Sequence, residues 1–240
     1  EIVNFLVDDV RQCLLAPMKR FDLMLGSLRF TGRCKVDGKE NKKGVSIADI
    51  TLPIYTKKAV SGDKDNIITW MNTEFIEKLR TKGYAEMNRN TFNKRIATSK
   101  EFLGKYTMKF GDMEFNSGNM VTTEMVNRYL GAVDIPFRIR IKEEWIQTSE
   151  DEMVNAVPDD KVSFLPAIDP RKKLGTMKWK RPYEMIDRIP GRTYTEAEDG
   201  KMFISSYRNS EGRFMEYGME AIPNIEIPNK MAIADLSALG

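Results

Sequence analysis

The chain has 240 residues, of which 41% are hydrophobic and 30% charged, an ordinary composition for a soluble globular protein. Its net charge of +3 is too small to indicate nucleic-acid binding by itself, and no apolar run approaches the roughly 20 residues that span a bilayer. Histidine is absent, and Cys13 and Cys34 form no CxxC pair, which excludes a structural zinc site.

Residues 1–30 carry apolar side chains at steps of three or four, which predicts one long amphipathic helix. Pro17 lies in the middle and lacks an N–H, so we expect the helix to bend or divide there, and Gly32 is a natural stop. The chain begins at Glu1 inside this pattern without a cap, so we expect a fragment or a product of processing. The apolar stripe is interpreted as a core-facing surface rather than a partner-binding one.

Two strands are predicted next, over residues 33–37 and 45–52, because apolar and polar residues alternate in both. The loop between them has a glycine at each end and is polar. It carries Lys39, Lys42 and Lys43, and it is either a solvated tip or a binding tip. Cys13 on the helix and Cys34 on the first strand are expected to be reduced thiols.

The middle of the chain mixes helices and strands. Polar residues 55–65 predict a connection between domains. Periodicity and capping residues then predict helices over 66–82, 88–102 and 122–130, strands over 84–87 and 137–141, and a loose hairpin over 106–115. Residues 143–155 are interpreted as polar and partly helical, and residues 157–161 as a turn that leads into a strand over 162–165.

The last third is predicted to begin irregularly, over residues 168–192, and to end in strands. Residues 201–208 and 213–221 flank the turn Asn209-Ser210-Glu211-Gly212, which predicts a hairpin. Pro223 and Pro228 interrupt the pattern before a final strand over 230–236. This order of elements predicts an α+β fold in which the first and last parts form one domain around an inserted middle.

No group of residues in the sequence indicates catalysis, a metal site or a cofactor site. Asp159 and Asp160 are adjacent after a proline, a position where aspartate normally forms a turn. The acidic runs at 143–144 and 150–152 are interpreted as solvated charge, with a divalent cation site as the alternative. No phosphate-binding loop, nucleophile elbow or HExxH motif is present. We therefore expect a protein that is not an enzyme.

One basic stretch is the best nucleic-acid candidate, because its cations surround Trp179. It consists of Arg171, Lys172, Lys173, Lys178, Lys180 and Arg181. The nearby Asp169, Glu184 and Asp187 reduce its charge. Two interpretations stay open: a nucleic-acid-binding module that uses residues 172–181, and a loop that pairs with acidic residues of another subunit.

The order of these elements resembles the major capsid proteins of tailed phages, most closely the lambda-type family. In that family a leucine-proline-aspartate-asparagine turn precedes a strand in the last third, and residues 157–162 (VPDDKV) match it. A final family strand ends in leucine-leucine-alanine-aspartate, and residues 231–235 (MAIAD) match that end. The long helix that ends at Gly32 resembles the family's spine helix.

The resemblance implies a structural, self-assembling shell subunit of a double-stranded DNA phage or prophage. It implies a peripheral domain over residues 1–60 and 168–240 and an axial domain over 61–167. The implied partners are other copies in pentamers and hexamers, scaffold or decoration proteins, and packaged DNA by non-specific contact at most, with no membrane. The implied location is the virion, and the host cytoplasm during assembly. The family's N-terminal arm and extended loop are not in this sequence, so we expect this chain to be monomeric when dilute.

Overall fold

The computed structural model describes residues 2–36, 48–80, 82–104, 121–149, 152–167 and 174–239, with side chains of the first helix from Leu15 onward. The chain forms two compact units. We name them the sheet unit (Glu1–Leu25 and Gly175–Glu226) and the core unit (Gly26–Leu174 and Ile227–Gly240). These limits differ from the expected peripheral and axial domains, whose boundaries stay a prediction. The observed elements confirm a mixed α+β fold.

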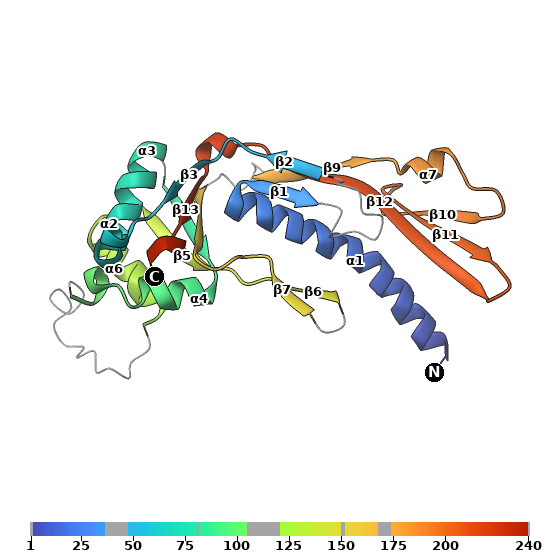
Figure 1. Cartoon of the computed structure of the whole chain (residues 1–240), viewed down its shortest axis with the longest axis horizontal. Coiled ribbons are helices and arrows are strands. Elements are labelled where there is room, and N and C mark those ends of the chain that lie inside the picture. The colour runs from blue at the N-terminus through green and yellow to red at the C-terminus, as the bar shows by residue number, and fades with distance from the viewer. Residues whose placement is uncertain are drawn as a thin grey trace. The chain divides into compact units, whose positions relative to one another are not determined.

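The first helix, α1, spans Ile2–Thr31 and continues through Pro17 without a break (Figure 1). The expected division at Pro17 is therefore wrong, because the helix keeps its hydrogen bonds on both sides of the single missing donor; the bend stays a prediction. Gly32 ends the helix as expected, with φ of 72° and its N–H donated to the carbonyl of Leu28 at 3.1 Å. Cys34 follows as a buried thiol that is not in a disulfide. The side chain of Cys13 lies outside the described residues.

A five-stranded sheet forms the centre of the core unit (Figure 1), in the order β3-β13-β8-β4-β5. Its strands are β3 (Tyr55–Lys58), β4 (Gly83–Met87), β5 (Phe137–Ile141), β8 (Lys161–Pro166) and β13 (Ala232–Asp235). β13 pairs parallel with β3 and antiparallel with β8. The polar segment expected to connect two domains thus contains an edge strand. The other strands lie where the sequence predicts them.

Helical segments pack around this sheet, and Figure 1 shows α2, α3, α4 and α6 beside it. They are η1 (Ser61–Asn66), α2 (Ile67–Met71), η2 (Asn72–Ile76), α3 (Glu77–Leu79), α4 (Arg89–Thr91), η3 (Phe92–Ile96), α6 (Thr123–Ala132), η4 (Pro228–Lys230) and η5 (Ser237–Leu239). Two of them, η2 and η3, are π-helical turns. The helix predicted over residues 66–82 ends earlier than expected, at Leu79, because Arg80 takes a left-handed conformation with φ of 47°.

Aromatic side chains fill the space between the sheet and the helices. Phe164 of β8 stacks on Phe75 with ring centroids 4.7 Å apart and meets Phe137 edge-on at 5.8 Å. Phe102 and Tyr129 form a second edge-on pair at 5.5 Å. All five side chains are buried. Burial of each contributes about 1.5–3 kcal/mol to folding, so this cluster is the main hydrophobic core of the described chain.

Two hairpins complete the core unit. β1 (Arg33–Val36) pairs antiparallel with β2 (Ala48–Thr51), as the alternation predicts. β6 (Trp145–Ser149) pairs with β7 (Glu152–Asn155), so the partly helical interpretation of residues 143–155 is wrong. In that hairpin Ile146 is buried, whereas the apolar side chains of Trp145 and Met153 are exposed. Apolar residues therefore lie on both faces of the hairpin, and the sequence lacks the alternation that predicts a strand. The lysine-bearing tip between β1 and β2 and the hairpin expected over 106–115 lie outside the described residues.

A four-stranded antiparallel sheet forms the sheet unit, in the order β10-β11-β12-β9. Its strands are β9 (Gly175–Lys180), β10 (Thr193–Ala197), β11 (Met202–Arg208) and β12 (Arg213–Ile225). The β11–β12 hairpin confirms the hairpin predicted around residues 209–212. β12, however, continues through Pro223, where the sequence analysis expected the strand pattern to be interrupted. The described part of the segment predicted to be irregular, residues 174–192, is more regular than expected, because it contains β9 and the short helix α7 (Tyr183–Ile186).

Candidate functional site

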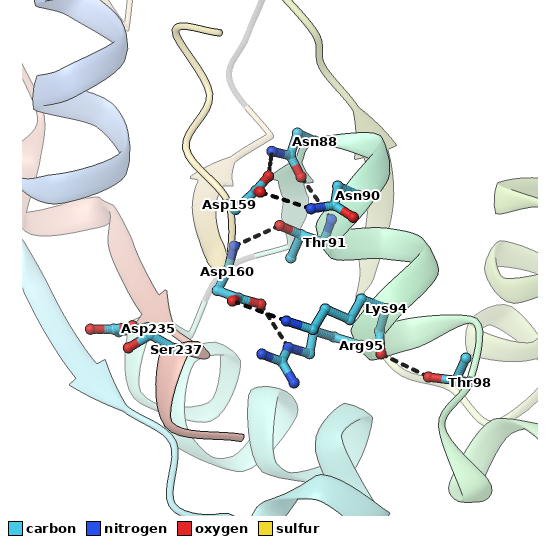
Figure 2. Close-up of polar contacts among 10 residues, drawn as sticks. All are labelled: Asn88, Asn90, Thr91, Lys94, Arg95, Thr98, Asp159, Asp160, Asp235 and Ser237. Carbon is cyan, nitrogen blue, oxygen red and sulfur yellow. Dashed lines mark hydrogen bonds and ion pairs between the residues drawn. The ribbon is translucent and has the colours of Figure 1, made fainter. Parts of the chain in front are cut away.

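The turn that carries the capsid-like motif, residues 157–161, is fixed by the segment that starts α4. Asp159 accepts hydrogen bonds from the amide of Asn88 at 2.5 Å and from the amide of Asn90 at 2.7 Å (Figure 2). Asn88 also donates to the carbonyl of Val157 at 3.1 Å, and its oxygen accepts from the N–H of Thr91 at 2.7 Å. Asn88 therefore caps α4, as the sequence predicts, and holds the turn at the same time.

The next residue, Asp160, is bound to the same helical segment (Figure 2). Its backbone N–H donates to the hydroxyl of Thr91 at 2.8 Å, and its carboxylate accepts from Nε of Arg95 at 2.6 Å. Lys94 adds a weaker ion pair at 3.8 Å. The Arg95 side chain is 3% exposed and that of Asp160 18%, so the pair is largely shielded from water. Asp160 has φ of 56°, a left-handed conformation that aspartate tolerates in turns.

The turn is also connected to β13, the strand that carries the second capsid-like motif. The carbonyl of Asp160 accepts the N–H of Leu236 at 2.7 Å, and Lys161 pairs with Asp235 at 2.7 Å. Burial by itself raises the pKa of Asp235, but the hydrogen bonds from Lys161 and Ser237 outweigh it and hold this pKa below its ordinary value. Figure 2 shows Asp235 and Ser237 on the opposite side of Asp160 from α4.

This polar cluster joins three segments that are far apart in the sequence: the start of α4, the turn before β8, and the end of β13. Both carboxylates of the turn are used as hydrogen-bond acceptors, which confirms the interpretation of Asp159 and Asp160 as turn formers. The polar groups of this cluster bind one another, so the role that the arrangement supports is to hold the three segments in place. Sequence reasoning missed Arg95, whose spacing from Asn88 and Thr91 on one helical segment was the available signal.

The basic residues named from the sequence are only partly described. Lys39, Lys42, Lys43, Arg171, Lys172 and Lys173 lie outside the described residues. Lys178 and Lys180 lie on β9, and Arg181 follows it; all three are exposed. Lys180 pairs with Glu220 at 3.6 Å, and Arg181 pairs with Glu196. Two of these three cations therefore have acidic partners in their own sheet.

Trp179 lies beside a shallow cavity of about 440 Å³ in the sheet unit, lined also by Lys180, Arg181, Glu196, Asp199, Gly200 and Lys201. The indole meets Phe21 of α1 edge-on at 5.5 Å, and the Lys201 ammonium lies 5.7 Å from the centre of its ring. Trp179 is therefore a packing residue as well as a wall of the cavity.

In the described part of the chain, no three His, Cys, Asp or Glu side chains are grouped so that they could hold a metal ion. No described helix combines the length and apolarity needed to cross a membrane.

Comparisons with known proteins give one informative result. No protein-family model and no curated protein matches the sequence. Among solved structures, the fold is similar to a crystal structure named the "putative capsid protein of prophage (E. coli CFT073)", with a TM-score of 0.56 and 12% sequence identity. The match covers 96% of this chain and 66% of that chain, so this chain spans just under two thirds of its neighbour's length. At this identity the likeness shows a shared fold: nearly the whole chain is folded like that prophage protein.

Proposed function

We propose that this chain is a structural subunit of the capsid of a double-stranded DNA phage or prophage, and not an enzyme. The observation that carries the proposal is the fold likeness to a prophage capsid protein across 96% of the chain. A likeness of this extent reaches both compact units and is not limited to one common motif. Fold alone does not determine function, so the proposal also rests on the segments that resemble the capsid family.

The two motif segments support the narrower assignment to a lambda-type protein. Residues 157–162 and 231–235 lie far apart in the sequence but meet in space, where β8 and β13 pair antiparallel from Ala232 opposite Phe164 to Asp235 opposite Lys161. This pairing is expected if the two motif segments form one structural unit that this chain shares with the lambda-type family. On this proposal α1 is the spine helix, residues 1–60 and 168–240 form the peripheral domain, and residues 61–167 form the axial domain.

The proposed location is the virion, with assembly from pentamers and hexamers in the host cytoplasm. The test is to express the complete gene product, alone and with its scaffold, and to examine it by light scattering and electron microscopy. Rings or shells are the expected result. A protein that stays monomeric across salt and protein concentration, with and without scaffold, would require the capsid assignment to be abandoned.

The alternative, a nucleic-acid-binding module that uses Lys172–Arg181, makes a different prediction. A module that neutralises several phosphates loses affinity for generic DNA steeply as salt rises. A titration of DNA binding against salt therefore separates the two functions. The ion pairs that Lys180 and Arg181 form within the sheet unit reduce the positive charge available to phosphates.

A further inference from the structure

The tip of the β11–β12 hairpin carries an unfavourable pair of like charges. Arg208 and Arg213 are directly opposite each other in the register, so their side chains share one face of the sheet. Both are exposed, and neither forms an ion pair with any described residue, including Glu211 in the turn between them. Like charges at directly opposed positions destabilise a sheet. An acidic partner supplied from outside would remove this repulsion.

The hairpin tip is preformed. The side-chain oxygen of Asn209 accepts the N–H groups of Glu211 at 2.9 Å and Gly212 at 3.1 Å, and the backbone of Asn209 donates to the carbonyl of Gly212 at 3.0 Å. The arginines therefore project from a fixed turn and lose little backbone freedom when they are bound. Apolar area adjoins them on the same face, because Met215 is 46% exposed and Tyr217 38%.

The opposite end of β11 carries the complementary charge. The turn between β10 and β11 contains Glu198 and Asp199, both exposed and both at left-handed φ angles of 52° and 55°. Neither carboxylate is in an ion pair with a residue that the structure describes. Asp199 also lines the cavity beside Trp179, but Lys180, Arg181 and Lys201 line it too, so the acidic surface is the turn itself and not the cavity.

One copy of the chain cannot bring these two ends together. β11 is seven residues long, so its ends are separated by about 20 Å, far beyond the reach of an ion pair. Two complementary sites at separate places on one surface can meet only across two copies, and repetition of such a head-to-tail contact builds rings or filaments. The basic tip and the acidic turn thus fit each other across two copies.

We propose that the arginine tip of one copy, Arg208 and Arg213, binds the acidic turn of a second copy, Glu198 and Asp199. The inference rests on the proposed capsid function and names a contact through which its subunits associate. It assigns an interaction role to residues outside the basic stretch that the sequence singled out.

Charge reversal tests this contact. The tip variant Arg208→Glu/Arg213→Glu and the turn variant Glu198→Lys/Asp199→Lys are each compared with the wild type by sedimentation velocity of the complete protein. Each variant alone brings like charges together and is expected to weaken association about tenfold or more. In a mixture of the two variants, every contact between unlike copies pairs opposite charges, so association through alternating copies is expected to recover toward the wild-type level.

The matched control for the tip variant is Arg128→Glu/Arg138→Glu, which makes the same change in net charge as that variant at exposed positions in the core unit. It is expected to leave association unchanged. The proposed contact would be overturned, with the capsid function left standing, if the tip variant and the turn variant both associate as well as the wild type. It would also be overturned if both variants lose association and their mixture does not recover it. A wild-type protein that never associates would overturn both.

Discussion

Replacing Asp160 by asparagine should destabilise the core unit more than any other single conservative change in the turn. Asparagine keeps the shape of the side chain and tolerates the left-handed φ of 56°. It also keeps the backbone N–H bond to Thr91 and the carbonyl bond to Leu236. The substitution therefore removes the negative charge opposite Arg95 and little else.

The size of the effect follows from the exposure of the pair. Breaking a fully buried ion pair by removal of one partner costs about 3–5 kcal/mol, and a hydrogen bond to a charged group contributes about 1.5–3 kcal/mol. Arg95 is 3% exposed, which favours the higher range, but Asp160 is 18% exposed and water solvates part of the site. We expect Asp160→Asn to lower the free energy of unfolding by about 2–3 kcal/mol.

Urea denaturation followed by tryptophan fluorescence measures this change. Trp70 reports on the core unit, because it packs edge-on against Phe75 at 5.3 Å, and a Trp179→Phe background removes the signal from the sheet unit. The urea midpoint should fall while the slope m stays constant, as for a change in stability alone.

Asp134→Asn is the control, since Asp134 has the same left-handed φ of 56° but is exposed and forms no ion pair with any residue described. It should change stability by less than about 0.5 kcal/mol. In a double-mutant cycle, Arg95→Met should cost less in the Asp160→Asn background than alone, because the two residues interact. Equal costs for Asp160→Asn and Asp134→Asn would refute the reasoning.

Three further changes test other parts of the structure. Gly26→Ala should destabilise the chain despite a gain of about 1 kcal/mol in helix propensity, because the new Cβ would lie 2.5 Å from the carbonyl oxygen of Ala156; a higher thermal midpoint would contradict this close approach. Asp235 has a lowered pKa in the folded state, so its contribution to the free energy of unfolding is complete above its unfolded pKa of about 3.9 and is lost as pH falls through the folded value. The difference in stability between wild type and Asp235→Asn, measured by denaturation at successively lower pH, should therefore shrink. A difference that stays constant down to strongly acidic pH would contradict the lowered pKa of Asp235. Cys34 should react with a thiol reagent only after unfolding, since its side chain is 2% exposed, and rapid labelling of Cys34 in the native protein, located by mass spectrometry, would show that the strand opens.

The elements that the sequence predicts well are those whose pattern is local. Strict alternation predicts β5, and Gly32 predicts the end of α1 because only a residue free of a Cβ takes its positive φ easily. Asn88 predicts the start of α4, since a capping side chain acts on residues three positions away. In each case the residues that determine the structure are neighbours in the chain.

The elements that were missed depend on distant partners or on exposure. β3 is exposed at all four residues and forms a strand only because β13, near the other end of the chain, pairs with it. β9 carries the basic side chains that favoured a loop, and it is ordered by pairing with the long strand β12. The Arg95–Asp160 pair likewise joins residues 65 positions apart, a distance over which no sequence pattern is readable.

The central place of β13 has a consequence for how the chain folds during synthesis. This strand fills the position between β3 and β8, yet it follows every other described strand in the sequence. Until residues 232–235 leave the ribosome, residues 55–58 have no strand to pair with, and β8, paired only with β4, presents an open edge of the kind through which chains aggregate. The parallel pairing of β3 with β13 also closes a very long loop, which makes it slow to form. When many copies are translated together, the nascent core unit is therefore most vulnerable to aggregation just before its last strand emerges.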